Sequence, residues 1–90
     1  MKNKDYLVTR LSELKTALVP QSMQYTTIHH SKIEILEWVY NEGNIKSQDE
    51  IENKILSIQE EITGLLRYQD TSYVLLGLKA QKTELENILN

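Results

Sequence analysis

The chain has 90 residues, with 10 Lys and Arg against 13 Asp and Glu, a formal net charge of −3 and no cysteine. This length predicts one domain, residues 1–90, close to the lower limit of what one hydrophobic core stabilises, so we expect self-association to contribute to its stability. The lack of cysteine excludes disulfides, thiolate chemistry and cysteine-based zinc sites, and it fits a cytoplasmic location. We expect no signal peptide, and no run approaches the ~20 apolar residues that cross a bilayer.

Charge is distributed unevenly along the chain. Residues 1–45 carry five basic and five acidic side chains, whereas residues 46–90 carry five and eight. The acidic second half argues against nucleic acid as the main ligand, because nucleic acid is itself a polyanion. The many Lys, Asn and Ile residues would suit an AT-rich genome, such as that of a low-GC bacterium or its phage.

Residues 4–18 are predicted to form the first helix. Leucines recur there at steps of four, three and four residues, which places them on one face of a helix. They are Leu7, Leu11, Leu14 and Leu18. Pro20 should end this helix, because proline clashes with the turn that precedes it.

An uncharged connecting segment follows at about residues 19–31. No Asp, Glu, Lys or Arg occurs from Thr16 to Ser31, although the chain is otherwise a quarter charged. We expect a loop that apolar side chains hold against the helices, with a short strand or extended arm as the alternative. Loops often carry binding residues, so this segment is also a candidate partner-binding surface.

The second helix is predicted at residues 32–41. Ser31 and Glu34 have the Ser-x-x-Glu spacing of a capping box, which favours a helix start at this position. Apolar residues then cover much of the girth of the helix, so we expect it to lie centrally or to contact two surfaces. Gly43 is suited to the left-handed conformation that follows a helix end.

The third helix is predicted at residues 48–68, where Ser47 and Glu50 form a second capping box. A row of five branched apolar side chains marks one stripe of this helix. The row consists of Ile51, Ile55, Ile58, Ile62 and Leu65. Isoleucine at both core positions of a heptad favours assemblies of more than two strands, or burial inside a bundle. We interpret the row as the core of an oligomer, with one wall of a multi-helix core as the alternative.

The fourth helix is predicted at residues 72–89, after a change of apolar phase at residues 69–72. A single long helix over residues 48–89 is the alternative, but a break is favoured because the average helix has only ~11 to 12 residues. Gly64 and Gly77 lie inside these helical patterns, where close approach of a neighbouring backbone or simple tolerance would explain them. The fold class is therefore all-α, with three or four helices in a small bundle or a helical hairpin with coiled-coil-like packing.

Residues able to carry chemistry are few. His29 and His30 are adjacent, so in a strand or loop their side chains point apart and cannot readily share a metal ion. We interpret four carboxylates as part of a solvated helix face. They are Glu60, Glu61, Glu84 and Glu86. We expect no catalytic residue, no metal and no cofactor.

These patterns favour a non-enzymatic protein–protein interaction module, such as a small adaptor, regulator or inhibitor. We expect it to act as a homodimer or higher oligomer and to bind another protein, with the acidic second half supplying electrostatic complementarity. Apolar and aromatic residues of the connecting segment and second helix are the candidate anchors. They are Met23, Tyr25, Ile28, Trp38 and Tyr40.

Two alternative functions remain open. The first is an oligomer that binds a small anionic ligand or nucleotide at a subunit interface, around the predicted helix break. The residues proposed for this site are Arg67, Tyr68, Thr71 and Lys79. The second is a DNA-binding regulator, because residues 35–51 superficially resemble the opening of a helix-turn-helix domain. Three acidic residues at the start of the next helix oppose this alternative.

Overall fold

The computed structural model describes residues 1–68 and 73–90, and these ranges contain four helices and a two-stranded hairpin. The elements are α1 (Lys4–Thr16), α2 (Met23–Val39), β1 (Tyr40–Asn41), β2 (Asn44–Ile45), α3 (Gln48–Arg67) and α4 (Tyr73–Leu89). The all-α prediction is confirmed, since the helices pack against one another in a small bundle. No helix of the described ranges combines the length and the apolar character needed to cross a membrane.

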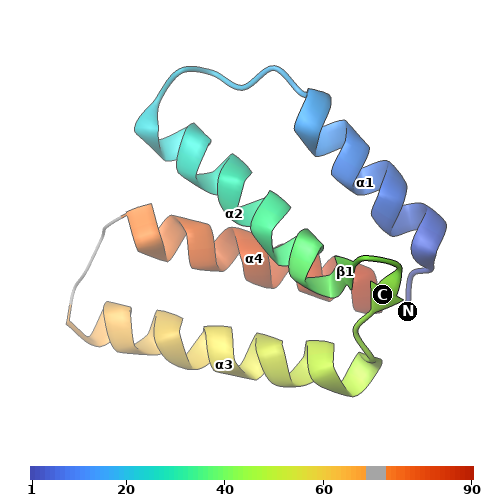
Figure 1. The fold of residues 1–90 in the computed structure, drawn as a ribbon. Coiled ribbons are helices and arrows are strands. Elements are labelled where there is room, and N and C mark those ends of the chain that lie inside the picture. The colour runs from blue at the N-terminus through green and yellow to red at the C-terminus, as the bar shows by residue number, and fades with distance from the viewer. Residues whose placement is uncertain (69–72) are drawn as a thin grey trace.

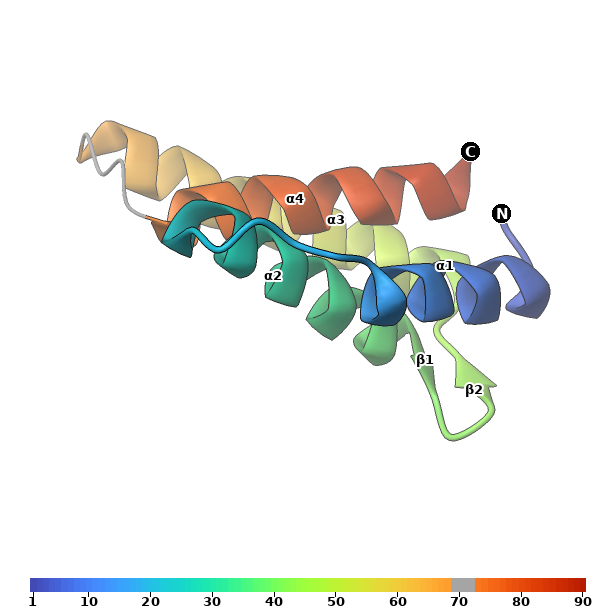
Figure 2. The same ribbon diagram turned by 90° about the horizontal axis from the view of Figure 1, so that it is seen from above.

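The helices pack side by side in the order α1, α2, α4, α3 (Figure 1). The helices α2 and α4 run in the same direction, while α1 and α3 run the opposite way (Figure 1). The two termini lie at the same end of the bundle, where the backbone N–H of Lys2 donates to the carbonyl of Ile88 at 2.7 Å (Figure 2). The two middle helices therefore each pack against two neighbours, as predicted for the second helix.

The first helix buries the predicted leucine face, with the exception of its last member. Leu7, Leu11 and Leu14 belong to the core, and Asn3 caps the helix by accepting a hydrogen bond from the Tyr6 backbone N–H at 3.1 Å. The helix ends at Thr16, so Leu18 lies beyond it.

The predicted start of the second helix is wrong. The helix begins at Met23, and its cap is Ser22, whose hydroxyl accepts a hydrogen bond from the Tyr25 backbone N–H at 3.2 Å. Ser31 lies inside the helix, so the Ser-x-x-Glu spacing with Glu34 does not act as a capping box. Residues 23–31 are thus helical and only residues 17–22 connect α1 to α2.

A short hairpin, which the sequence prediction lacked, separates α2 from α3. Tyr40 pairs with Ile45 and Asn41 with Asn44 in an antiparallel register. The two turn residues, Glu42 and Gly43, have φ angles of 51° and 82°. Positive φ at both central positions is what a type I′ hairpin turn requires. Gly43 therefore has the predicted left-handed conformation, but in a hairpin turn and not directly after a helix end.

The third and fourth helices are separate and antiparallel, as the favoured prediction had it (Figure 1). The capping box of Ser47 and Glu50 is confirmed, with both reciprocal hydrogen bonds at 3.2 Å. The predicted break at residues 69–72 lies outside the described residues. The core of the bundle consists of Leu7, Leu11, Leu14, Ile35, Leu36, Val39, Ile51, Ile58, Ile62, Leu75, Leu85 and Ile88.

One carboxylate of the predicted solvated face is in fact buried. Glu84 on α4 is only 2% exposed, and Arg10 on α1 contacts it with a distance of 2.6 Å between Nη2 and Oε1. Glu84 lies three residues after Gln81 and four before Ile88, at the border of the apolar face of α4. A carboxylate at such a border is expected to face water unless the partner helix is known, and the sequence prediction failed for that reason. The ion pair attaches α1 to α4.

Candidate functional site

The segment from Thr16 to Ser31 forms an uncharged surface on the bundle, which comprises the α1–α2 connection and the first half of α2. Three large apolar side chains are exposed on it: Leu18 at 100%, Met23 at 66% and Tyr25 at 54%. These exposed apolar side chains lie close together in the sequence, which makes the segment a candidate interaction surface. The uncharged segment therefore also exposes large apolar side chains to solvent.

A hollow of about 210 Å³ lies between the α1–α2 connection and α2; we call it the connection hollow. Its lining is Leu14, Ala17, Leu18, Val19, Pro20, Tyr25, Ile28, His29 and Lys32. All but His29 and Lys32 are largely apolar. The hollow forms because α1 ends at Thr16 and the connection must then reach the start of α2 at Met23, which leaves space beneath it.

A second depression of about 420 Å³ lies between the first halves of α2 and α4; we call it the α2–α4 groove. Its lining is Met23, Thr27, Ser31, Tyr73, Val74, Gly77, Leu78 and Gln81. The two helices approach closely here, since a Cβ atom on Gly77 would lie 2.5 Å from Oγ of Ser31. Close approach thus accounts for Gly77, whereas no atom lies within 4 Å of the corresponding position at Gly64.

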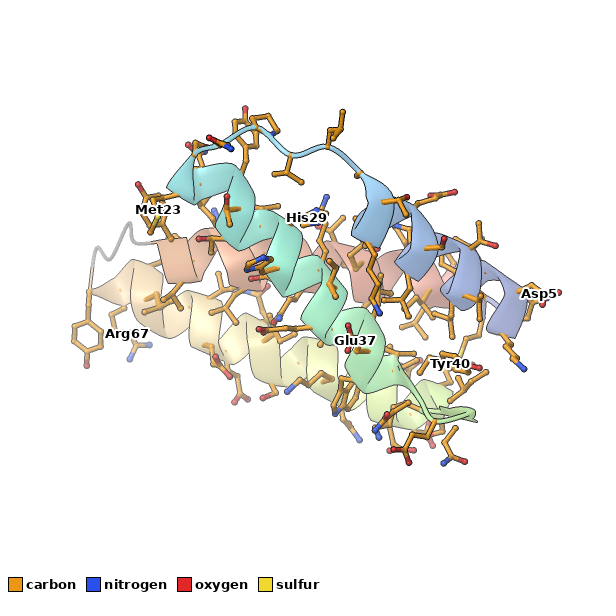
Figure 3. All side chains as sticks on the ribbon, turned by 45° about the horizontal axis from the view of Figure 1, so that its top comes forward. Asp5, Met23, His29, Glu37, Tyr40 and Arg67 are labelled. Atoms are coloured by element: carbon orange, nitrogen blue, oxygen red, sulfur yellow. The ribbon has the colours of Figure 1, made fainter. Side chains whose placement is uncertain are left out.

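The five predicted partner-binding residues do not form one site. Met23 lines the α2–α4 groove, while Tyr25 and Ile28 line the connection hollow. Tyr40 lies at the opposite end of α2 from Met23 (Figure 3). Trp38 also lies near that far end, partly buried against the core.

Two lysines from other elements surround Trp38. The Nζ atoms of Lys46 and Lys54 lie 5.2 Å and 5.5 Å from the centroid of its ring. Contacts of this kind are attractive because the face of the indole ring carries partial negative charge. Trp38 therefore links α2 to the segment after the hairpin and to α3, and this role in packing explains its position.

The residues of the alternative ligand site lie apart from both depressions. Arg67 is the last residue of α3, and its side chain is labelled at the edge of the bundle in Figure 3. Tyr68 and Lys79 are also exposed, and Thr71 lies outside the described residues. The three described residues line neither the connection hollow nor the α2–α4 groove. Binding of an anionic ligand by this set stays a prediction.

The predicted oligomer core packs within a single chain. Ile51, Ile58 and Ile62 are buried in the core of the bundle, and Ile55 and Leu65 are partly buried against it. One copy of the chain already covers most of this row, so a second copy would have to use other surfaces. Formation of a homo-oligomer stays a prediction.

The two histidines differ in their surroundings. His29 is partly buried in the lining of the connection hollow and His30 is exposed, with their ring centroids 6.3 Å apart. Within residues 1–68 and 73–90, no group of three or more His, Asp and Glu side chains is arranged to hold a metal ion.

One exposed apolar residue belongs to a predicted helix face. The leucine spacing predicts Leu18 on the buried face of the first helix, but Leu18 is fully exposed. Pro20 is the signal that shortens α1 and leaves Leu18 outside it.

Comparison of the chain with models of protein families, with curated proteins and with solved structures finds no match. The functional assignment therefore depends on the surfaces described above.

Proposed function

We propose that the chain is a non-enzymatic protein-interaction module, a small adaptor, regulator or inhibitor, that binds an apolar segment of another protein at the connection hollow. The observation that supports this proposal is the exposure of Leu18 and Tyr25 beside a depression lined mainly by apolar side chains. Covering a leucine that is completely exposed stabilises a complex by about 1.5–3 kcal/mol before the entropy of association is subtracted.

Tyr25 is suited to act as an anchor residue. It is 54% exposed at the first turn of α2, with its backbone N–H fixed by the Ser22 cap. Tyrosine offers a large apolar ring and a hydroxyl that can form a hydrogen bond, and it is enriched among the residues that contribute most to binding. Because α2 packs on two neighbours, the backbone that carries the ring is in place before the partner arrives.

The low charge of this surface predicts how binding responds to salt. From Thr16 to Ser31 the chain has no Asp, Glu, Lys or Arg, and Lys32 is the one cationic residue in the lining of the hollow. Salt screens interactions between charges and leaves apolar contact largely unaffected. We therefore expect an affinity that changes little as ionic strength rises.

Site-specific photocrosslinking tests this function. A photoreactive phenylalanine analogue is placed at Tyr25 and, as a control, at Leu56, which is 63% exposed on α3. In cells that produce the chain naturally, we expect one discrete protein adduct from position 25 and none of the same mass from position 56. The adduct should disappear when Leu18→Glu is added to the Tyr25 probe.

Equal adducts from both positions would contradict the proposal, as would an adduct that survives Leu18→Glu. Leu18 lies outside the described helices and its side chain is fully exposed, so this substitution should leave the fold intact. Circular dichroism of the variant checks that assumption.

A further inference from the structure

The α2–α4 groove is built into the packed helices and does not need a partner to form. Gly77 lets α4 approach α2 until a Cβ atom at this position would lie 2.5 Å from Oγ of Ser31. The side-chain amide of Gln81 donates a hydrogen bond to the Ser31 carbonyl at 3.1 Å, which fixes the inner end of the groove. Two contacts between α2 and α4 thus hold the shape of the groove.

Large apolar side chains project beside this groove. Met23 on α2 is 66% exposed, and Val74 on the first turn of α4 is 59% exposed, with Tyr73 next to it. The floor between them is made of small residues, Thr27, Ser31 and Gly77. A projecting side chain next to a depression of suitable size is what an isologous contact requires, because each copy must supply both the projection and the depression.

The charge of the chain favours a second copy of the chain as the occupant of the groove. Each copy carries a net charge of −3, so association through most of its surface would bring acidic side chains together. None of the eight residues that line the groove is charged. Two copies can therefore bring these eight residues together without opposing like charges, whereas a highly charged partner would lose solvation at this lining without gaining a counter-charge.

We propose that the α2–α4 groove binds a second copy of the chain in a two-fold dimer, in which Val74 of each protomer inserts beside Thr27 in the groove of its partner. A contact confined to the eight lining residues of each copy would be smaller than a standard stable interface, so the dimer forms reversibly and its population depends on concentration. The connection hollow contains neither Val74 nor Thr27, so the dimer is independent of the surface proposed for another protein.

Disulfide crosslinking tests the contact directly, because the natural chain contains no cysteine. Two variants, Thr27→Cys and Val74→Cys, are purified separately, with an isotope label on one of them, and are mixed under mild oxidation. We expect the mixed disulfide between position 27 of one chain and position 74 of the other to exceed either homodisulfide. The matched control mixes Leu56→Cys with Val74→Cys and should give little mixed product, since Leu56 lies outside the groove.

Equal yields of the two mixed disulfides would overturn the proposal, because they would show random collision. A product formed only between two copies of Val74→Cys would also overturn it, since Val74 would then meet itself and not the partner's groove. A mixed disulfide between positions 27 and 74 that exceeds the control product, and whose yield falls when the proteins are diluted before oxidation, supports it.

Sedimentation equilibrium gives a second measurement that does not depend on disulfide formation. The natural chain should shift from monomer to dimer with rising concentration, and Val74→Asp should remain monomeric over the same range. The control Leu56→Asp makes the same change of charge at an equally exposed apolar residue and should dimerise like the natural chain. A natural chain that stays monomeric at its highest soluble concentration would overturn the dimer and leave the photocrosslinking test of the connection hollow unaffected.

Discussion

Arg10 on α1 donates two hydrogen bonds to Glu84 on α4, a residue 74 positions away in the sequence. The distances are 2.6 Å from Nη2 to Oε1 and 3.3 Å from Nε to Oε2. This two-point contact raises the pKa of Arg10, chiefly through the hydrogen bond to Glu84, so the guanidinium stays charged throughout the accessible pH range. The pair joins the outermost helix of the bundle to α4.

Removing the arginine should destabilise the protein, because it leaves the buried carboxylate of Glu84 without its partner. We expect Arg10→Ala to lower the free energy of unfolding by about 3 kcal/mol, at the lower end of the range for a buried pair since Arg10 itself is partly exposed. Urea denaturation at pH 7 measures the change.

The exposed pair Lys15–Glu37 provides the matched control. Its Nζ and Oε1 atoms are 3.5 Å apart, and both side chains are more than half exposed. Lys15→Ala should therefore change the free energy of unfolding by less than about 1 kcal/mol. Similar losses for the two variants would show that burial of Glu84 does not govern its interaction with Arg10.

The capping box of α3 predicts a dependence of stability on acid pH. The backbone N–H and then the hydroxyl of Ser47 donate hydrogen bonds that lower the pKa of Glu50 from its ordinary value of 4.5. A carboxyl whose pKa is lowered by folding stabilises the folded state above its unfolded pKa, and this contribution is lost as the pH falls through the folded pKa. The advantage of the natural chain over Glu50→Gln should thus be present at pH 7 and should be lost as the pH falls below the ordinary pKa of 4.5 and through the lowered pKa of the folded state.

Urea midpoints measured from pH 7 down to pH 3 would check this prediction. Glu60→Gln is the control, because Glu60 lies on the same helix but away from the cap. A gap between the natural chain and Glu50→Gln that stays constant over this pH range would contradict the role given to the Glu50 charge.

The two glycines inside helices should respond differently to alanine. At Gly64 no atom lies within 4 Å of an added Cβ, so Gly64→Ala should stabilise the protein by up to about 1 kcal/mol through helix propensity. At Gly77 the added Cβ would meet Oγ of Ser31 at 2.5 Å, so Gly77→Ala should stabilise less or destabilise.

A double-mutant cycle isolates the contact at Gly77. Ser31→Ala removes the hydroxyl oxygen, so Gly77→Ala should be better tolerated in that background than in the natural chain. Thermal denaturation of the four proteins measures the difference. Additive effects of the two substitutions would mean that Ser31 is not what restricts position 77.

Much of the fold was predictable because the responsible signals are local. The capping box at Ser47 and the leucines of α1 follow from spacing alone, and both were predicted correctly. The start of α2 was missed because its first turns contain β-branched and uncharged residues, which favoured a loop. Ile28, Ile35 and Val39 do keep one helical phase, which is the signal that could have extended the helix.

The candidate site was less predictable because it depends on contacts between distant segments. The α2–α4 groove exists only where Thr27 and Ser31 meet Gly77, about 50 residues further along the chain. No pattern in either segment specifies that meeting. The same is true of Glu84, whose burial depends on Arg10.

The stripe of α3 should dominate the stability of the single chain. Ile58 is 1% exposed, so Ile58→Ala should lower the free energy of unfolding by about 2–5 kcal/mol through lost burial and a residual cavity. Leu56→Ala, at an exposed position two residues away, should change it by less than about 0.5 kcal/mol. Urea denaturation compares the two, and equal effects would place the stripe outside the core.

The central claim about self-association is that two copies of the chain meet at the α2–α4 groove. Amide ¹H–¹⁵N NMR spectra of the chain alone, recorded over a series of protein concentrations, test it most directly. We predict concentration-dependent shifts confined to residues 23–31 and 73–81, the segments that line the α2–α4 groove. Spectra that do not change with concentration, or shifts that cluster around Leu56 on α3, would contradict the claim.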